Sequence, residues 1–430
     1  MKFKELFDEY GLEYTPLVEK EGDVIKIPSK VEAKLKYITK TELKTIHSDE
    51  QTAKELILVI LSNFKETFVL SQQNDAKEPV KAGFKVLNWE VLAKQVRLTS
   101  KPSPYAKILK LLIAYGIIEK GRNYSVGNRS NEYRLTDKYF GKGIVSYEFK
   151  SKVLRARNSK MVEDNLRNVL KSEIGYNELM NRERLTFPTN EEALEYLKGL
   201  AKKGATNKRG KKIIHLNKRS KEAFTDDNCV FVEDYVTILN YLREMVIPIV
   251  TGTNGGGRVI TSFNFLPSLL RPLVKFDGEE LKEKDYSTLH PNIIQFIHGG
   301  SNKNAITHDK VAAYLNIERH IAKIEHLSFF NKKWELMFES PLYKYYIENE
   351  PKMMENIYES KKEHGYKSTS RDCFYFETEL MKSVIKEAKK EYINVVYCFD
   401  AIYTTEGSQE RLGEIMNKQA ELFGLLTKTN

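Results

Sequence analysis

In the first third of the chain, the spacing of apolar residues is that of helices in some stretches and of short strands in others. The helical stretches carry an apolar residue every three or four positions, and the β-rich runs are bounded by glycine or polar residues. This pattern predicts helices over 53–61, 89–96 and 105–115, and strands over 117–120 and 132–135. Gly116 follows the last of these helices in the position that commonly ends a helix.

Two acidic residues stand beside predicted strands in the second half of the chain. Asp285 ends a predicted short strand and is followed by an apolar, helix-like run. Asp400 lies between the β-rich runs 395–399 and 401–404, a pattern that predicts a hairpin with Asp400 at or near its turn. Alone, an aspartate in such a place usually caps a turn. Together, two carboxylates on adjacent strands are what a pair of magnesium ions needs for phosphoryl transfer.

A helical pattern between these aspartates carries a pair of basic residues. Arg319 and Lys323 are four residues apart, so they share one face of the helix that is predicted to run from Arg319 through Phe330. Such a face can hold a triphosphate at two points. By itself, the spacing fits a solvated helix surface better.

The motifs of this half of the chain occur in the order Gly257-Arg258, Arg271, Asp285-Tyr286-Ser287, His308-Asp309, Arg319-x-x-Ala322-Lys323 and Phe399-Asp400. Their order and spacing resemble the palm and fingers of family A DNA polymerases, whose palm is shared by the phage-type single-subunit RNA polymerases. The resemblance covers roughly residues 250–430. It implies an α+β right-hand fold and template-directed nucleotidyl transfer.

The resemblance also implies roles for individual residues. Asp285 and Asp400 would hold two Mg²⁺ ions, with the carbonyl of Tyr286 as a further ligand. Arg319 and Lys323 would bind the incoming nucleoside triphosphate, and Lys323 would protonate the departing pyrophosphate. In the family, the residue five positions after the first aspartate is bulky in DNA polymerases and small in the related RNA polymerases. His290 holds that position here, which implies a preference for dNTPs.

The chain departs from the family pattern at several positions. The family's finger-helix tyrosine corresponds to Asn331, and the aromatic or hydrophobic position before it is Leu327. Phe399-Asp400-Ala401 keeps only the aspartate of the family's last motif. The stretch from Asp285 to Ile294 is also similar to the first motif of family B polymerases, but the paired aspartates of the family B last motif are missing around Asp400. The pattern is closer to family A.

A second region carries features of a nucleic-acid-binding module. Helix, turn, helix and two strands over 88–138 resemble a winged helix, which can place its second helix in a major groove and its wing on the backbone. Lys107, Arg122 and Arg129 are the basic residues expected to contact nucleic acid here. Winged helices also serve as protein-packing units, and that alternative stays open.

Basic residues are dense between this region and the predicted palm. The stretch from Glu148 to about Glu244 is predicted to be mostly helical, and the resemblance places a duplex-holding thumb there, with Lys211 and Lys212 among its phosphate contacts. Arg258 and Arg271 are expected near the primer and template. The glycine-rich stretch before Arg258 lacks the spacing of a P-loop, so a nucleotide-binding P-loop is rejected.

Composition bounds the class of protein. The 430 residues carry a formal charge of +10 and a pI near 9.0, which favours a polyanionic partner without proving one. With 41% hydrophobic and 30% charged residues, the composition is that of a soluble globular protein. The three cysteines form no CxxC, so neither a disulfide framework nor a zinc site is indicated. No signal segment or membrane span is predicted, and we expect a cytoplasmic protein of a bacterium or a phage-infected cell, from a phage or mobile element.

The sequence therefore predicts an α+β polymerase in four parts. These are an N-terminal accessory region (1–87), a winged-helix-like module (88–147), a basic, helical, thumb-like region (148–249) and a palm (250–430) with a finger insertion at about 300–390. The expected partners are a nucleic-acid template, a primer and nucleoside triphosphates, whereas a protein subunit is left open. DNA synthesis in replication is favoured. The alternatives are a phage-type RNA polymerase and a DNA-binding replication initiator with an inactive palm.

Overall fold

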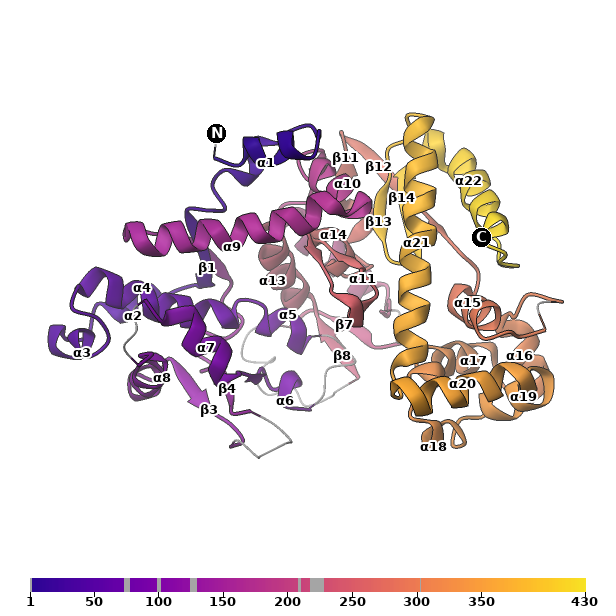
Figure 1. The fold of residues 1–430 in the computed structure, drawn as a ribbon, viewed down its shortest axis with the longest axis horizontal. Helices are drawn as coiled ribbons and strands as arrows, with labels where there is room; N and C mark the ends of the chain where they lie inside the picture. The colour runs from indigo at the N-terminus through magenta and orange to yellow at the C-terminus, as the bar shows by residue number, and fades with distance from the viewer. Residues whose placement is uncertain are drawn as a thin grey trace. The chain divides into compact units, whose positions relative to one another are not determined.

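The computed structural model describes residues 2–72, 78–98, 102–123, 130–207, 210–216, 228–301 and 303–430 (Figure 1). The chain forms two compact units of mixed helix and sheet. The first unit contains Met1–Arg167, Phe187–Ile247 and Phe265–Leu273, and the second contains Asn168–Thr186, Pro248–Asn264 and Val274–Asn430. Helices predominate and the sheets are small, so the mixed helix-and-sheet composition agrees with the predicted class. The four-part division stays a prediction.

The first unit is mostly helical, with short strands between the helices. Its elements are α1 (Lys4–Glu9), β1 (Val24–Pro28), α2 (Val31–Leu35), α3 (Lys40–Lys44), α4 (Glu50–Leu61), α5 (Thr67–Ser71), α6 (Glu78–Lys81), β2 (Lys85–Val86), α7 (Trp89–Val96), α8 (Tyr105–Ala114), β3 (Ile118–Lys120), β4 (Glu132–Leu135), β5 (Ile144–Glu148), most of α9 (Lys152–Lys171), α11 (Asn190–Lys202), β7 (Lys212–Ile214), β8 (Cys229–Phe231) and α13 (Val232–Arg243). The predicted helices and strands of residues 53–135 are confirmed.

The core of the first unit lies between α4 and the helix-turn-helix formed by α7 and α8. α4 packs against α7 and α8, and an antiparallel sheet in the order β2-β4-β3 completes the group. The apolar faces of these elements are fully buried, as the predicted periodicity requires, at Ile57, Leu92, Val96, Ile108 and Leu112. Gly116 has a φ of +63°, the left-handed conformation that ends a helix at low cost for glycine.

The second unit is built around one sheet and one long helix. Its elements are α10 (Glu173–Asn181), β6 (Leu185–Thr186), β9 (Ile249–Val250), β10 (Val259–Ile260), α14 (Ser262–Phe265), β11 (Lys275–Phe276), β12 (Glu279–Asp285), α15 (Leu289–Ile297), α16 (His308–Leu315), α17 (Arg319–His326), α18 (Trp334–Met337), α19 (Leu342–Asn349), α20 (Pro351–His364), α21 (Ser368–Lys390), β13 (Val396–Cys398), β14 (Ala401–Thr405) and α22 (Gln409–Leu422).

The sheet of the second unit has five antiparallel strands in the order β13-β14-β12-β11-β6. α21, the long orange helix of Figure 1, packs against α10, α15, α20 and α22. Its apolar face carries Cys373, Leu380, Met381, Val384 and Ile385, all buried in the largest core cluster. Among the described residues, no helix combines the length and apolar composition needed to cross a membrane.

The predicted helix through Phe330 is shorter than expected. α17 ends at His326, and a 3₁₀ turn over Phe329–Asn331 follows it. Phe329 and Phe330 are consecutive in sequence and both buried, and both rings pack on Tyr346. Two consecutive side chains of an α-helix point about 100° apart, so the chain leaves the helix to bury both rings.

Glu178 on α10 is a buried carboxyl group that couples the stability of the second unit to pH. It is 3% exposed and accepts hydrogen bonds from the Tyr397 amide (2.9 Å) and from Asn177 Nδ2 (2.9 Å). Burial, which outweighs these bonds, raises the pKa of Glu178 to about 8. Because the folded pKa lies above the ordinary value of 4.5, stability is highest below pH 4.5 and falls as the pH rises towards 8.

We therefore expect Glu178→Gln to stabilise the protein at pH 8 and to change it little at pH 5. Glutamine keeps the acceptor oxygen and cannot ionise, and the gain at pH 8 is at most about 5 kcal/mol. Thermal unfolding at both pH values measures the effect. Glu279→Gln, which changes an exposed carboxylate at the start of β12, is the control. An equal shift of the unfolding midpoint at both pH values would contradict the prediction.

Candidate active site

The sheet of the second unit brings Asp285 and Asp400 to one place. Asp285 is the last residue of β12 and pairs in register with Ala401. Asp400 directly precedes Ala401, in the two-residue turn that joins β13 to β14. The two aspartates therefore lie at the same end of neighbouring strands. Both line a small pocket of about 140 Å³, which we call the aspartate pocket.

Two strained residues flank these aspartates. Phe399, in the same turn as Asp400, has a φ of +60°, and Thr288, three residues after Asp285, has a φ of +55°. A β-branched or bulky residue in the left-handed region is an outlier that persists only where the surrounding structure holds it. Such strain is concentrated at functional sites, so the backbone itself marks this end of the sheet as a candidate site.

The backbone after Asp285 is held by residues 427–430. The Asp285 carbonyl accepts from the Asn430 amide (3.1 Å), and the Ser287 amide donates to the Lys428 carbonyl (2.8 Å). Tyr286 is 2% exposed, and its hydroxyl donates to the Met416 carbonyl (2.6 Å). The buried tyrosine ring therefore anchors the strand end in the core. Because this side chain is buried, only the backbone of Tyr286 could contact a nucleotide.

The basic residues predicted on one helix face line the same pocket. Arg319 and Lys323 lie one turn apart on α17, and both side chains are exposed. Arg319 Nε is 3.0 Å from the Asp309 carboxylate on α16, which directs its guanidinium. The aspartate pocket thus has carboxylates on the sheet side and cations on the α17 side. This is the charge arrangement that a metal-bound triphosphate requires.

Two histidines lie beside the α17 cations. His308 Nδ1 and His326 Nδ1 are 3.1 Å apart, and His326 Nε2 is 2.7 Å from the Tyr346 hydroxyl. Burial, with the nearby positive charges of Arg319 and Lys323, lowers the pKa of His308 to about 4. Burial and the charge of His308 lower the pKa of His326 to about 3. Both rings are therefore neutral at pH 7, and they add no positive charge to the pocket.

His290 is fixed from behind by a buried ionic network. Glu377, on α21, has a fully buried side chain, and its carboxylate accepts from Arg258 Nε (2.8 Å) and Nη2 (2.6 Å). The same carboxylate lies 2.5 Å from His290 Nε2. The Arg258 guanidinium also lies over the Phe374 ring, 3.6 Å from its centroid. The His290 ring, 33% exposed, therefore reaches the aspartate pocket with its orientation set by Glu377.

The charges of this network stabilise one another. Burial by itself would raise the pKa of Glu377, but Arg258 and His290 together lower it. Burial by itself would lower the pKa of His290, but the bond to Glu377 and its charge raise it. Burial raises the pKa of Asp400, and the nearby His290 opposes that shift. Glu377 is thus held as the carboxylate that pairs with Arg258 and contacts His290.

The donor set at the aspartates fits magnesium. Asp285 and Asp400 supply hard carboxylate oxygens, and the backbone of Tyr286 lines the same pocket. In the described ranges, no three His, Cys, Asp or Glu side chains are grouped so that they could hold a metal ion. Mg²⁺ commonly binds through one or two carboxylates, with waters and substrate phosphates completing its six ligands. Two carboxylates in a pocket that Arg319 and Lys323 also line suit that ion.

The other predicted nucleic-acid contacts lie elsewhere, and several are engaged within their own unit. Arg258 is paired with Glu377, so its guanidinium is held rather than projecting freely towards a primer. Arg122 pairs with the buried Glu132 (2.8 Å), Lys107 donates to the Thr45 carbonyl (3.1 Å) and Arg271 donates to the Leu266 carbonyl (3.2 Å). Lys212 begins β7 with its side chain exposed, next to Lys211. Arg129 lies outside the described residues.

Basic side chains of the predicted thumb-like region (148–249) also bond to groups of the first unit. Arg157 donates to the carbonyls of Lys94 and Arg97, and Arg167 pairs with Glu9 (2.9 Å) and Glu163 (3.1 Å). These partners belong to the first unit itself. The predicted phosphate contacts of this region stay a prediction.

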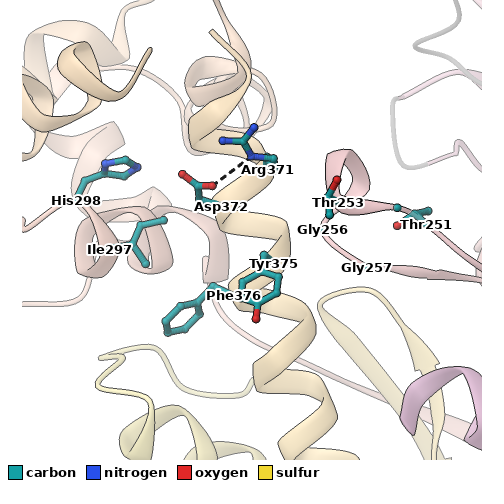
Figure 2. A pocket seen from close by; sticks show the side chains of 11 residues that line it. Thr251, Thr253, Gly256, Gly257, Ile297, His298, Arg371, Asp372, Tyr375 and Phe376 are labelled. Atoms are coloured by element: carbon teal, nitrogen blue, oxygen red, sulfur yellow. Dashed lines mark ion pairs between the residues drawn. The ribbon is translucent and has the colours of Figure 1, made fainter. Parts of the chain in front are cut away.

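A second and larger hollow lies in the second unit, lined in part by Gly257 and Phe376, the residues that precede Arg258 and Glu377. It measures about 700 Å³ and is formed by the loop between β9 and β10, the end of α15 and the first half of α21 (Figure 2). We call it the glycine-loop pocket, after Gly252, Gly256 and Gly257 in its lining. The sequence indicated the loop but not the cavity.

Comparison with known proteins gives little beyond this geometry. No family model matches the chain, and no curated protein matches it. Among solved structures, the polymerase domain of Pol1 from M. smegmatis, in complex with a DNA primer-template and a dNTP, matches with a TM-score of 0.35 and 10% identity. The match covers 63% of this chain and 72% of that one. A TM-score this low does not establish a shared fold, so the functional argument rests on the site.

Glu377 is the site residue that sequence reasoning missed. It lies on one face of α21 with Cys373, Leu380 and Val384, which are all buried. A glutamate at a buried position of an amphipathic helix needs a cationic partner, because an unpaired buried charge is costly. That periodicity could have singled out Glu377. It could not have named Arg258 and His290, which lie 119 and 87 residues away.

Proposed function

We propose that this chain is a template-directed nucleic-acid polymerase that uses two magnesium ions and favours DNA synthesis. The observation that carries the proposal is the aspartate pocket. Asp285, at the end of β12, and Asp400, in the turn before β14, line it together with Arg319 and Lys323, and His290 forms part of its wall. In this proposal the sheet and α15 serve as the palm of a right-hand polymerase, and α16 to α20 serve as its fingers.

In the proposed mechanism the chain mainly positions and neutralises charge. Asp285 and Asp400 hold the metal pair, which when bound activates the attacking hydroxyl and neutralises the departing pyrophosphate. Arg319 and Lys323 bind the triphosphate oxygens, and Lys323 supplies a proton as pyrophosphate leaves. The His290 ring fills the space beneath the sugar, and Glu377 keeps that ring from swinging away. Phosphoryl transfer depends mainly on positioning and charge neutralisation, so a site with few catalytic groups can carry it out.

Primer extension tests the proposal directly. The purified full chain is given a primed DNA template and Mg²⁺, with dNTPs and NTPs supplied in parallel reactions. Extension with dNTPs, and much weaker extension with NTPs, is the expected result. Extension with NTPs alone would favour the phage-type RNA polymerase alternative. Duplex binding without any extension would favour a replication initiator with an inactive palm. The convergence of the two aspartates on one pocket favours an active centre over the latter.

The nucleic-acid-binding roles of 88–147 and of the basic stretch 148–249 are part of the same proposal. The helix-turn-helix of α7 and α8 supports the first, and the overall charge of +10 supports both.

Lys323→Ala is expected to slow nucleotide incorporation by about ten- to a hundredfold and to leave template affinity within about twofold. The reason is that Lys323 lines the aspartate pocket, where the triphosphate is proposed to bind, and a hydrogen bond to a charged group contributes about 1.5–3 kcal/mol. Single-turnover incorporation and primer–template binding measure the two effects. Lys344→Ala removes an exposed lysine of α19 as the control. Unchanged incorporation would show that α17 does not bind the triphosphate.

A further inference from the structure

The glycine-loop pocket is a cavity lined by a loop and by two helices. The loop Thr251–Gly257 forms one wall, and Arg371, Asp372, Tyr375 and Phe376 on α21 form the other (Figure 2). Ile297 and His298, where α15 ends, also line it. At about 700 Å³ the cavity has the size of sites that take small organic ligands.

Glycine at position 256 lets the loop lie directly against α21. Gly256 and Gly257 have φ values of +66° and +73°, which side-chain-bearing residues rarely adopt. A Cβ on Gly256 would lie 2.6 Å from the Phe374 carbonyl carbon, so the loop contacts α21 backbone to backbone. Gly256 therefore lies against the α21 backbone at Phe374 and Tyr375, and Thr251 and Thr253 of the same loop line the cavity beside it.

The α21 wall presents an aromatic ring beside a cation. Tyr375 is 62% exposed, although large aromatic side chains usually bury most of their surface. Phe376, next to it, is packed against Phe296 and Phe423. Arg371 lies one turn before Tyr375, so the two residues lie on the same face of α21 and both line the pocket. The Arg371 Nε is 3.5 Å from the Asp372 carboxylate, a contact too long and too exposed to hold it firmly.

An exposed aromatic ring with a nearby cation, in an apolar hollow, suits a planar ligand that carries negative charge. A nucleotide unit of a nucleic-acid strand has both parts, since its base stacks on aromatic rings and its phosphate pairs with arginine. The glycine-loop pocket is connected to the aspartate pocket through neighbouring residues of the chain. Gly257 and Phe376 line the glycine-loop pocket. The next residues along the chain, Arg258 and Glu377, form the pair that orients His290, which lines the aspartate pocket.

We propose that the glycine-loop pocket binds an unpaired nucleobase of single-stranded DNA, stacked on Tyr375, with the adjoining phosphate at Arg371. This inference rests on the proposed function, because a polymerase must hold unpaired template next to its active site. The pocket would hold one nucleotide of that strand out of the duplex.

Equilibrium binding tests the proposal without any catalysis. The full chain is titrated, without nucleoside triphosphates, into a single-stranded DNA of about twelve nucleotides that contains one 2-aminopurine. Fluorescence anisotropy reports affinity, and quenching of 2-aminopurine reports stacking. Tyr375→Ala is expected to weaken binding about 5- to 150-fold and to reduce the quenching, since base stacking on an aromatic side chain contributes about 1–3 kcal/mol. Tyr375→Phe, which keeps the ring, is expected to bind within about twofold of the wild type.

Matched variants keep the result unambiguous. Tyr392→Ala removes a tyrosine that is 93% exposed, just beyond the end of α21, and should change neither signal. Arg371→Gln should weaken binding and lower its salt dependence by about one phosphate contact. Thermal unfolding confirms that each variant is folded. Affinity and quenching that are unchanged in folded Tyr375→Ala would overturn the proposal. Displacement of the oligonucleotide by free deoxynucleoside monophosphate at equal affinity would overturn its assignment to a strand.

The same measurements separate this inference from the proposed function. Binding that depends on Tyr375, in a protein that extends no primer, would refute the polymerase proposal and leave the single-strand site standing. Primer extension by the wild type, with no effect of Tyr375→Ala on binding, would refute the site alone.

Discussion

Replacing either Asp285 or Asp400 with alanine is expected to reduce nucleotide incorporation at least about a thousandfold. Both carboxylates line the aspartate pocket at the ends of paired strands, so each is expected to hold the same metal pair. Loss of either removes charge stabilisation of several kcal/mol from the transition state, and each 1.36 kcal/mol is a factor of about ten in rate. Single-turnover primer extension with Mg²⁺ measures the loss.

A matched control separates catalysis from folding. Glu283→Ala removes an exposed carboxylate from the same strand, two residues before Asp285, and is expected to keep near wild-type rates. Affinity for the primer–template should stay within about threefold in the aspartate variants, because phosphate contacts dominate that affinity. If Asp400→Ala extended primers normally while Glu283→Ala did not, the assignment of the metal ligands would be wrong.

The parts of the site that the sequence predicted are those defined by local pattern. The β-rich runs on either side of Asp400 fix a hairpin turn, and the strand before Asp285 pairs with that hairpin. Arg319 and Lys323 share a face because residues four apart on a helix are neighbours. The hairpin turn and the helix face each need only a few consecutive residues, so a periodicity argument reaches them. The pairing of the Asp285 strand with the hairpin joins distant segments, and it was implied by the family resemblance.

The parts that could not be predicted depend on contacts between distant segments. The sequence could not show that Arg122 pairs with Glu132, or that Arg157 donates to backbone carbonyls of the folded unit. The α17 helix stops at His326 because the next two phenylalanines are needed in the core around Tyr346. Charge and periodicity are properties of a segment, whereas these outcomes are decided by what the segment packs against.

Sugar selection is the second property for which we expect a large change. His290→Ala is expected to raise the efficiency of ribonucleotide incorporation relative to dNTPs by about tenfold or more, because the ring that would crowd the 2′-hydroxyl is removed. The ratio of kcat/KM for NTPs and dNTPs, measured on the same primed template, gives the effect. His320→Ala, at an exposed position of α17, is the control. An unchanged ratio would show that His290 only packs in the palm.

Glu377 should influence the same ratio through His290. Glu377→Gln keeps the shape but loses the charge that binds His290 and Arg258, so the ring is held less firmly and discrimination should fall by a smaller factor. Glu377→Ala would leave Arg258 buried without its partner, at a cost of about 3–5 kcal/mol, so glutamine is the informative change. In the His290→Ala background, Glu377→Gln should have no further effect on the ratio, because the residue through which it acts is gone. If the two substitutions changed the ratio additively, Glu377 would act through Arg258 and not through His290.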